Sequence, residues 1–210
     1  MHMEKDLKSL FAARVKDFHM PRYNELPDVG LYLEQVTKYI NGILIQLGFT
    51  EITPSMVSNY VKKGVIPPPV KKQYYVDQIG YLLFVGIAKN VISIEEIVGL
   101  IKMQLETYDS ETAYNYFCSE FENMLHYICG LKNSVDKIGV TNTEEKMMFR
   151  SVIISVSHII FIRWKNRPKA PCGVLFSTGF FRKSLDFRFY SWYARSCAYS
   201  ALPSAYNPLV

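Results

Sequence analysis

ITPSMVSNYVKKGVIPPPVKKQYYVDQIGYLLFVGIAKNVISIEEI, residues 52–97, has the order of parts expected of a small helical domain. Thr53 is a good helix N-cap, and Pro54 suits the first helical position because a proline there gives up no hydrogen bond. Gly64 is placed to end that helix as its C′ residue. The prolines at 67–69 then predict a stiff, extended loop. This stretch therefore predicts a short helix with defined ends, followed by a rigid connection.

Lysines concentrate in and after this helix, for which we predict residues 54–63. The formal charge of the whole chain is only +5, so the local concentration matters more than the sum. Clustered positive charge on one small element is the electrostatic pattern of phosphate binding. From residue 54 to 75 the chain has no acidic residue and four lysines: Lys62, Lys63, Lys71 and Lys72.

Composition and cysteine usage limit the class of protein. With 210 residues, 49% of them apolar and 14% aromatic, the chain can bury a sizeable core and is neither disordered nor fibrous. The four cysteines form no CxxC pair, and the first residues lack the apolar stretch of a signal peptide. We therefore expect reduced thiols and a cytoplasmic location. The longest apolar run, residues 152–161, is too short to span a bilayer.

Apolar periodicity predicts helices through most of the chain, so the expected fold class is all-α. Ser93 with Glu96, and Thr141 with Glu144, have the spacing of capping boxes and mark two helix starts. Besides 54–63, the predicted helices are 4–16, 31–47, 76–89, one from 93, one through 114–131 and one from 141 to about 164.

One helix in the second half carries an unbroken apolar seam. Its members are spaced 3, 4, 3, 4 and 3 residues apart, as in the a and d positions of a heptad. Cys118, Leu125 and Cys129 widen the seam, which favours packing in a bundle or a dimer over a two-stranded coil. The seam consists of Tyr114, Phe117, Phe121, Met124, Ile128 and Leu131.

Several short motifs carry a resemblance to known proteins. TP at 53–54, GVIP at 64–67 and SIEEI at 93–97 resemble the DNA-binding head of the MerR-type winged helix-turn-helix regulators. LPDVGLYLEQVTKYIN and SNYVKKGVIPPPVKKQYY are similar to a bacterial family, domain of unknown function 1836 (DUF1836), over roughly residues 22–165. The resemblance implies a MerR-like head whose helix 54–63 enters the major groove of DNA, followed by a C-terminal helical bundle.

The chain departs from the MerR pattern in three places. Ser55 and Ser58 stand where MerR-type recognition helices usually have arginines. The segment between Pro69 and Tyr74 is short for the usual wing hairpin, and the helix predicted at 31–47 is longer than its counterpart. The lysines would therefore have to supply the phosphate contacts.

The candidate DNA-binding residues share one face of the helix 54–63 or lie in the loop after it. On the helix they fall at i, i+3, i+4 and i+7, opposite the apolar stripe. Asparagine can pair with adenine through two hydrogen bonds, and serine and lysine can contact bases or phosphates. A solvated polar face and a solubilising loop are the alternative interpretation of the same residues. The candidates are Ser55, Ser58, Asn59, Lys62, Lys63, Lys71, Lys72 and Gln73.

Catalytic and metal-binding patterns are not found in the sequence. His126 and Cys129 could face one metal ion, but two ligands without a third favour residues that line the core. No nucleotide-binding, zinc-protease or hydrolase motif occurs. We therefore expect no metal site, no cofactor and no enzymatic activity.

Four regions follow from these patterns. The last region is crowded with aromatic residues and shows no sustained period, so a poorly ordered extension is expected there. The regions are a peripheral N-terminal helix at 1–21, a MerR-like DNA-binding domain at 22–107, a helical dimerisation and effector region at 108–168, and the tail at 169–210.

The resulting hypothesis is a sequence-specific, double-stranded DNA-binding transcription regulator that acts as a homodimer. The seam would supply part of the dimer surface, since a symmetric dimer reads two half-sites. An unidentified small-molecule effector could bind among the helices after residue 110. The alternative, left open by Ser55 and Ser58, is a protein-interaction module that keeps the MerR-like fold without binding DNA. A third hypothesis is a small-molecule or membrane-surface sensor that uses the aromatic tail.

Overall fold

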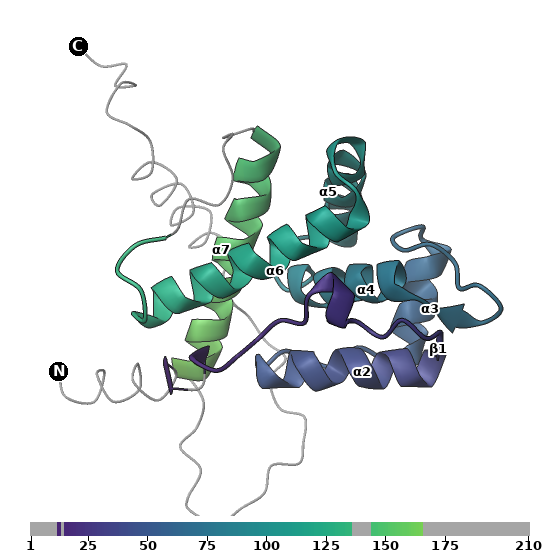
Figure 1. Cartoon of the computed structure of the whole chain (residues 1–210), viewed down its shortest axis with the longest axis horizontal. Coiled ribbons are helices and arrows are strands. Elements are labelled where there is room, and N and C mark those ends of the chain that lie inside the picture. Colours follow the sequence, from purple (N-terminus) through teal and green to yellow (C-terminus); the bar gives the residue numbers. More distant parts are fainter. Residues whose placement is uncertain (1–11, 14, 136–143, 166–210) are drawn as a thin grey trace, which may run out of the picture. The chain divides into compact units, whose positions relative to one another are not determined.

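The computed structural model describes residues 12–13, 15–135 and 144–165, which are largely α-helical (Figure 1). A small two-stranded antiparallel sheet accompanies the helices. In chain order the elements are η1 (Tyr23–Glu25), β1 (Leu31–Tyr32), α2 (Leu33–Gln46), α3 (Pro54–Lys62), β2 (Gln73–Tyr74), α4 (Val76–Ala88), α5 (Ile94–Thr107), α6 (Ser110–Cys129) and α7 (Glu144–Lys165).

The helix starts predicted from local sequence at Thr53 and Ser93 are confirmed. The Thr53 hydroxyl accepts a hydrogen bond from the Met56 N–H at 3.2 Å and caps α3. Ser93 and Glu96 form the complete capping box: the Glu96 N–H donates to the serine hydroxyl, and the Ser93 N–H donates to the glutamate carboxylate at 2.7 Å. The Thr141 capping box lies outside the described residues.

The helix predicted at residues 31–47 begins two residues later than expected. Leu31 and Tyr32 form β1 instead and pair with β2, Leu31 opposite Tyr74 and Tyr32 opposite Gln73. Pairing with a strand some forty residues away overrides the helical period of the local sequence. This pairing ties the start of α2 to the loop that follows α3.

α4 lies at the centre of the described helices, between α2 and α6 in Figure 1. It also contacts α5 and α7, and all its residues from Leu82 to Ala88 are buried. A helix that is apolar on every side is expected in such a position. Gly86 allows the closest approach, because a Cβ there would lie 3.0 Å from Cδ1 of Leu44 in α2.

The apolar seam of α6 faces the core of its own chain. Tyr114, Phe117, Phe121 and Met124 are all buried. The Phe117 ring packs edge-on against Phe84 of α4, with the ring centroids 5.3 Å apart. These four side chains are therefore not exposed for a second copy of the chain.

The C-terminal end of the seam differs from the prediction. α6 ends at Cys129, and Gly130 adopts the left-handed conformation of a C′ residue (φ 75°). Ile128 is half-buried, whereas Leu131 lies beyond the helix and is exposed. The 3-4 spacing of apolar residues in the sequence runs on to Leu131, but the helix does not. Gly130 ends the helix regardless of the apolar period.

The N-terminal segment is not peripheral where the structure describes it. Met20 is fully buried, and its N–H donates to the Glu122 carboxylate of α6 at 2.7 Å. Arg22 pairs with the same carboxylate at 2.6 Å, and the Tyr114 hydroxyl donates to the Pro21 carbonyl. This segment therefore packs as part of the same core.

The domain boundaries predicted after residues 21 and 107 stay predictions. The described residues up to Lys165 belong to one compact unit, Met1–Lys165. The predicted tail at 169–210 and the first half of the predicted N-terminal helix lie outside the described residues. None of the described helices combines the length and the apolar character needed to cross a membrane.

Phe121→Ala tests the intramolecular role of the seam. Because the ring is fully buried against Phe117 and Phe18, we expect the free energy of unfolding to fall by about 3–5 kcal/mol. Urea unfolding at several protein concentrations measures this loss, which should not depend on concentration. Leu131→Ala, at an exposed position, is the control. A loss that grows on dilution would show instead that the seam is an interface between copies.

Candidate nucleic-acid interface

Asn41 of α2 fixes the chain just before α3. Its Nδ2 donates to the Ile52 carbonyl at 2.9 Å, and its Oδ1 accepts from the Ile52 N–H at 2.8 Å. The carboxamide thus satisfies both backbone groups of a buried residue, which would otherwise lack partners in the core. Thr53 caps α3 immediately afterwards. The start of α3 is therefore attached to α2.

Gln78 of α4 fixes the chain after α3. Its Nε2 donates to the Pro68 carbonyl at 2.6 Å and to the Pro67 carbonyl at 3.3 Å. Its Oε1 accepts from the Tyr75 N–H at 2.7 Å, so the same side chain caps α4. Gln78 is buried, and its bonds hold the proline segment against α4.

Gly64 ends α3 as predicted and turns the chain towards the prolines. Its φ of 66° lies in the left-handed region that favours glycine. The Val65 N–H donates to the Tyr60 carbonyl at 2.9 Å, and the Gly64 N–H donates to the Val61 carbonyl at 3.0 Å. These two bonds form a Schellman motif. Both ends of α3 are thus fixed by specific hydrogen bonds.

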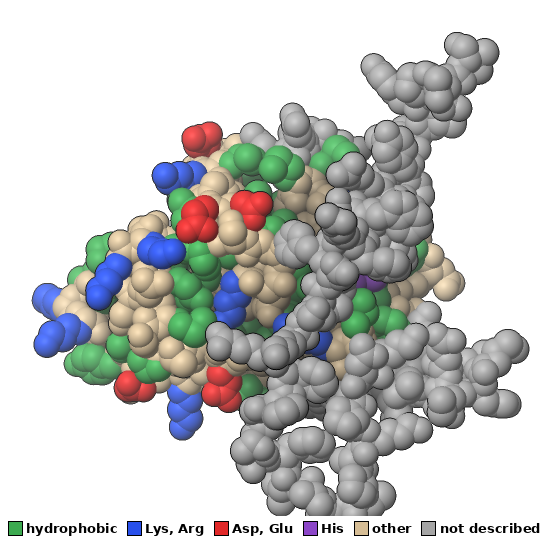
Figure 2. Space-filling view, turned by 180° about the vertical axis from the view of Figure 1, so that it is seen from behind, with side chains coloured by type: hydrophobic (Ala, Val, Ile, Leu, Met, Phe, Trp, Pro, Cys, Tyr) green, Lys and Arg blue, Asp and Glu red, His purple; other side chains and the backbone are tan. Residues whose placement is uncertain are grey.

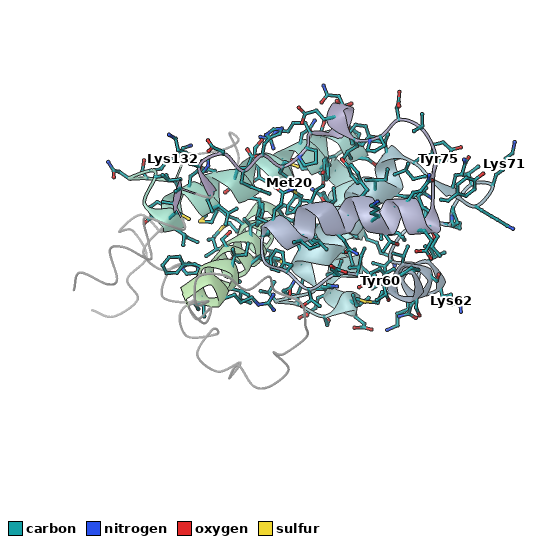
Figure 3. The ribbon with its side chains drawn as sticks, turned by 90° about the horizontal axis from the view of Figure 1, so that it is seen from below. Met20, Tyr60, Lys62, Lys71, Tyr75 and Lys132 are labelled. Atoms are coloured by element: carbon teal, nitrogen blue, oxygen red, sulfur yellow. The ribbon has the colours of Figure 1, made fainter. Side chains whose placement is uncertain are left out.

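The polar face of α3 points to solvent, except for the half-buried Ser58. Ser55, Asn59 and Lys62 are exposed, and Val57 and Tyr60 are buried on the opposite side. This orientation is the one predicted from the sequence. In Figure 3, Lys62 projects from the right-hand end of the view, at the end of the molecule that also carries Lys71.

Two of the predicted contact residues at 54–63 have partners within the chain. The Ser58 hydroxyl donates to the Pro54 carbonyl at 3.0 Å, and the side chain is half-buried. Lys63 lies 3.4 Å from the Glu95 carboxylate of α5. The backbone N–H of Glu95 itself, together with Lys63, lowers the pKa of that carboxyl. Both partners are largely exposed, so the pair is weak but reduces the charge that Lys63 presents.

Lys71 and Lys72 form the tip of a tight β-hairpin, within the segment 64–75 that the sequence predicted as a basic loop. The Val70 N–H donates to the Gln73 carbonyl at 3.0 Å, and the Gln73 N–H donates back at 2.9 Å. Residues 70–74, which we call the basic hairpin, continue into β2 and its pairing with β1. A two-residue turn allows a hairpin in a segment that is too short for a hairpin with a longer loop.

The tip of the basic hairpin has an unusual backbone conformation. Lys71 and Lys72 both have positive φ, 49° and 66°, as the central residues of a type I′ turn require. Asn-Gly is the usual pair in such a turn, and a residue with a Cβ costs roughly 1–2 kcal/mol in the left-handed region. Both lysines are exposed. The turn therefore presents two positive charges at the expense of backbone strain.

Gln73, another predicted contact residue, lies at the base of the basic hairpin. The Tyr75 hydroxyl donates to its Oε1 at 3.2 Å. Gly30 leaves room for the Gln73 side chain, since a Cβ there would lie 2.9 Å from the Cβ of Gln73. Gln73 is half-buried and thus supports the hairpin more than it projects from it.

Positive side chains gather where α3 and the basic hairpin lie. In Figure 2, seen from behind Figure 1, Lys and Arg side chains (blue) are grouped at the left-hand end of the face, which carries these elements. The chain has no acidic residue from 54 to 75. We call α3 and the basic hairpin together the candidate interface.

Two residues that hold the candidate interface, Asn41 and Gln78, were not identified from the sequence. Gln78 follows the N-cap residue Tyr75 by three positions, which is the spacing of the second residue of a capping box. That signal was available, although it does not reveal the bonds to the prolines. Asn41 gives no local signal, because its partner Ile52 is eleven residues away. Among the described residues, no group of three metal-ligating side chains occurs around His126 and Cys129 or elsewhere.

Asn41→Leu tests whether Asn41 positions α3. Removing the carboxamide leaves the buried Ile52 N–H and carbonyl without these partners, so we expect the free energy of unfolding to fall by about 2–3 kcal/mol. Urea unfolding measures the change. Asn59→Ala, on the exposed face of α3, should alter stability by less than about 0.5 kcal/mol. Equal effects from both variants would exclude a special role for Asn41.

Replacing Lys71–Lys72 by Asn-Gly tests the strain at the hairpin tip. The double variant Lys71→Asn/Lys72→Gly supplies the residues that a type I′ turn prefers, and we expect about 1 kcal/mol of added stability. Thermal and urea unfolding measure it. Lys71→Gln/Lys72→Gln removes the same two charges without relieving the backbone, and separates strain from charge repulsion. A gain of equal size in this control would attribute the effect to charge.

Residues 21–117 match the sequence model of the family "Domain of unknown function (DUF1836)". The matched stretch contains α2 to α5 and the first turns of α6, and hence the whole candidate interface. It confirms the resemblance to that family over this range, which is shorter than the range expected from the sequence. No curated protein and no solved structure matches the chain.

Proposed function

We propose that this protein is a MerR-like regulator of transcription, cytoplasmic and homodimeric, that binds double-stranded DNA through the candidate interface. α3 would enter the major groove, and the basic hairpin would lie on the neighbouring backbone. The observation that supports the proposal most is that the exposed face of α3 and the strained, lysine-tipped hairpin lie at the same end of the described helices (Figure 3).

The dimensions and chemistry of α3 suit a groove. An α-helix with its side chains is about 10–12 Å across, and the major groove of B-DNA is about 12 Å wide. Ser55, Asn59 and Lys62 form the exposed face that would meet the bases. Among them Asn59 could read adenine through two hydrogen bonds. Ser58 would contribute less, because its hydroxyl already donates to the Pro54 carbonyl.

The basic hairpin suits the phosphate backbone. Backbone strain at an exposed position, where packing does not require it, is a frequent property of functional sites. Lysines at both turn positions place two ammonium groups at the tip, where long stems can follow the phosphates. The bonds of Gln78 to the prolines keep this tip at a set position relative to α3.

The homodimer in this proposal needs a surface other than the seam. Two-fold symmetric proteins bind two half-sites about one helical turn apart, so a dimer would raise the affinity of a small interface. Since Tyr114, Phe117, Phe121 and Met124 of the seam are buried in the chain's own core, the contact between copies would use other residues.

The experiment that tests the proposal is fluorescence anisotropy of the full chain on DNA fragments from around its own gene. Each phosphate contact contributes about 0.9 to the slope of log K against log salt. We expect Lys62→Gln/Lys71→Gln/Lys72→Gln to reduce the slope by about 2.7 and to weaken binding to every sequence. Asn59→Ala should instead reduce the preference for the specific fragment over competitor DNA.

Lys102→Gln, which removes one charge outside the candidate interface, is the control for charge and is compared with Lys62→Gln alone. Lys102 is exposed on α5, outside the candidate interface, and its loss should leave the affinity and slope nearly unchanged. An equal loss of DNA affinity in the control would show that the effect comes from net charge and not from the candidate interface. Absence of binding by the folded wild-type chain at low salt would contradict the proposal.

A second candidate function, recognition of a protein partner with the same elements, is favoured by a group of exposed apolar side chains. Tyr32 and Val70 are more than half exposed, and both lie next to Gln73 in the small sheet. Tyr32→Ser/Val70→Ser should abolish binding of such a partner and leave DNA binding largely intact, whereas the lysine variant should do the reverse. Pull-down and anisotropy on the same two variants distinguish the functions.

A further inference from the structure

A pocket lies where α5, α6 and α7 meet, away from the candidate interface. Its volume is about 170 Å³. The three helices contact one another pairwise around it. Its walls come from α5, from the connection after it, from α6 and from α7. The lining residues are Leu100, Met103, Gln104, Tyr108, Thr112, Ala113, Tyr116 and Phe149.

The size of the pocket limits its occupant. An engineered protein cavity of about 150 Å³ holds one benzene molecule. A pocket of 170 Å³ therefore has room for a single six-membered ring with a small substituent.

The walls favour an aromatic occupant without charge. Tyr108, Tyr116 and Phe149 supply aromatic rings, and the Met103 thioether can contact a ring edge favourably. Among the described residues that line the pocket there is no Asp, Glu, Lys or Arg, so a charged ligand would lose hydration without gaining a partner from them. Burial raises the pKa of the Tyr116 hydroxyl above its usual value.

Gln104 provides a polar group that could orient a ligand. Its Nε2 lies 3.4 Å from the Ala113 carbonyl oxygen, at the long limit of a hydrogen bond. Turning this carboxamide towards a ligand would therefore break only a weak hydrogen bond. A ligand hydroxyl could donate to its oxygen while the ring lies among the aromatic walls.

We propose that this pocket binds an uncharged, single-ring aromatic molecule that carries a hydroxyl group, that is, a simple phenol. The binding itself does not depend on the proposed function. Because the Phe149 wall stacks on Phe84 of α4 at 5.4 Å, and α4 carries Gln78, an effect of the ligand on DNA affinity is a further consequence. That consequence alone rests on the proposed function.

The test is isothermal titration calorimetry of the full chain with phenol, in the absence of DNA. For so small a ligand we expect saturable binding with a dissociation constant between roughly 0.1 and 1 mM. Benzoate, of similar size but charged, and cyclohexanol, which lacks the aromatic ring, should each bind at least about tenfold more weakly.

Three variants locate the binding. Met103→Trp fills the pocket from α5 and should abolish binding, whereas Lys102→Gln on the same helix should leave it unchanged. Gln104→Leu keeps the volume but removes the hydrogen bond, and should weaken phenol about threefold to tenfold while leaving toluene nearly unaffected. Gln104→Leu still tests the proposal if Met103→Trp does not fold.

Three outcomes would overturn the proposal. The first is that phenol does not bind the folded wild-type chain at concentrations of several millimolar. The second is that phenol binds equally well to folded Met103→Trp, and the third is that Gln104→Leu weakens phenol and toluene alike. Since no DNA is present, none of these results bears on the proposed function.

Discussion

The arrangement of the candidate interface depends on two carboxamides, the half-buried one of Asn41 and the buried one of Gln78. Asn41 of α2 bonds to both backbone groups of Ile52, just before α3. Gln78 of α4 bonds to the proline carbonyls just after it. A nine-residue helix has little stability by itself, so its position has to come from the structure around it. With both flanking segments attached to long helices, α3 can keep most of its polar side chains exposed and still be held rigidly.

The basic hairpin, unlike the segments that flank α3, contains an unfavourable backbone conformation. Its turn requires positive φ at two successive positions, and the chain has lysine at both instead of the favourable Asn-Gly pair. The local conformation is thus less stable than it could be, whereas the positive charge at the tip is greater. β1 compensates by pairing with β2, which extends the small sheet and supports the turn. Strain tolerated at an exposed, charged tip is consistent with selection for binding rather than for stability.

The parts of the fold that were predictable from sequence are those governed by neighbours along the chain. The Thr53 and Ser93 caps, the Gly64 stop and the buried stripe of α3 depend on residues within one turn. What was not predicted came from distant contacts. β1, expected to be helical, pairs with a segment about forty residues away. The sequence left open whether the α6 seam packs in a bundle or in a dimer, and in the structure Phe117 of the seam packs against α4. The contact of Lys63 with Glu95 of α5 gave no local signal either. The partner of an amphipathic helix cannot be read from its own periodicity. The type I′ turn was missed because lysine gives no signal for positive φ.

Hydrogen–deuterium exchange of the full chain with and without its upstream DNA tests the central claim most directly. We predict that DNA slows exchange in peptides covering residues 54–62 and 70–74, the candidate interface. Peptides from the interior of α6, which is buried in the free chain, should exchange at the same rate in both states. Protection confined to other elements, or no protection while DNA is bound, would contradict the assignment of α3 and the basic hairpin as the DNA-binding surface.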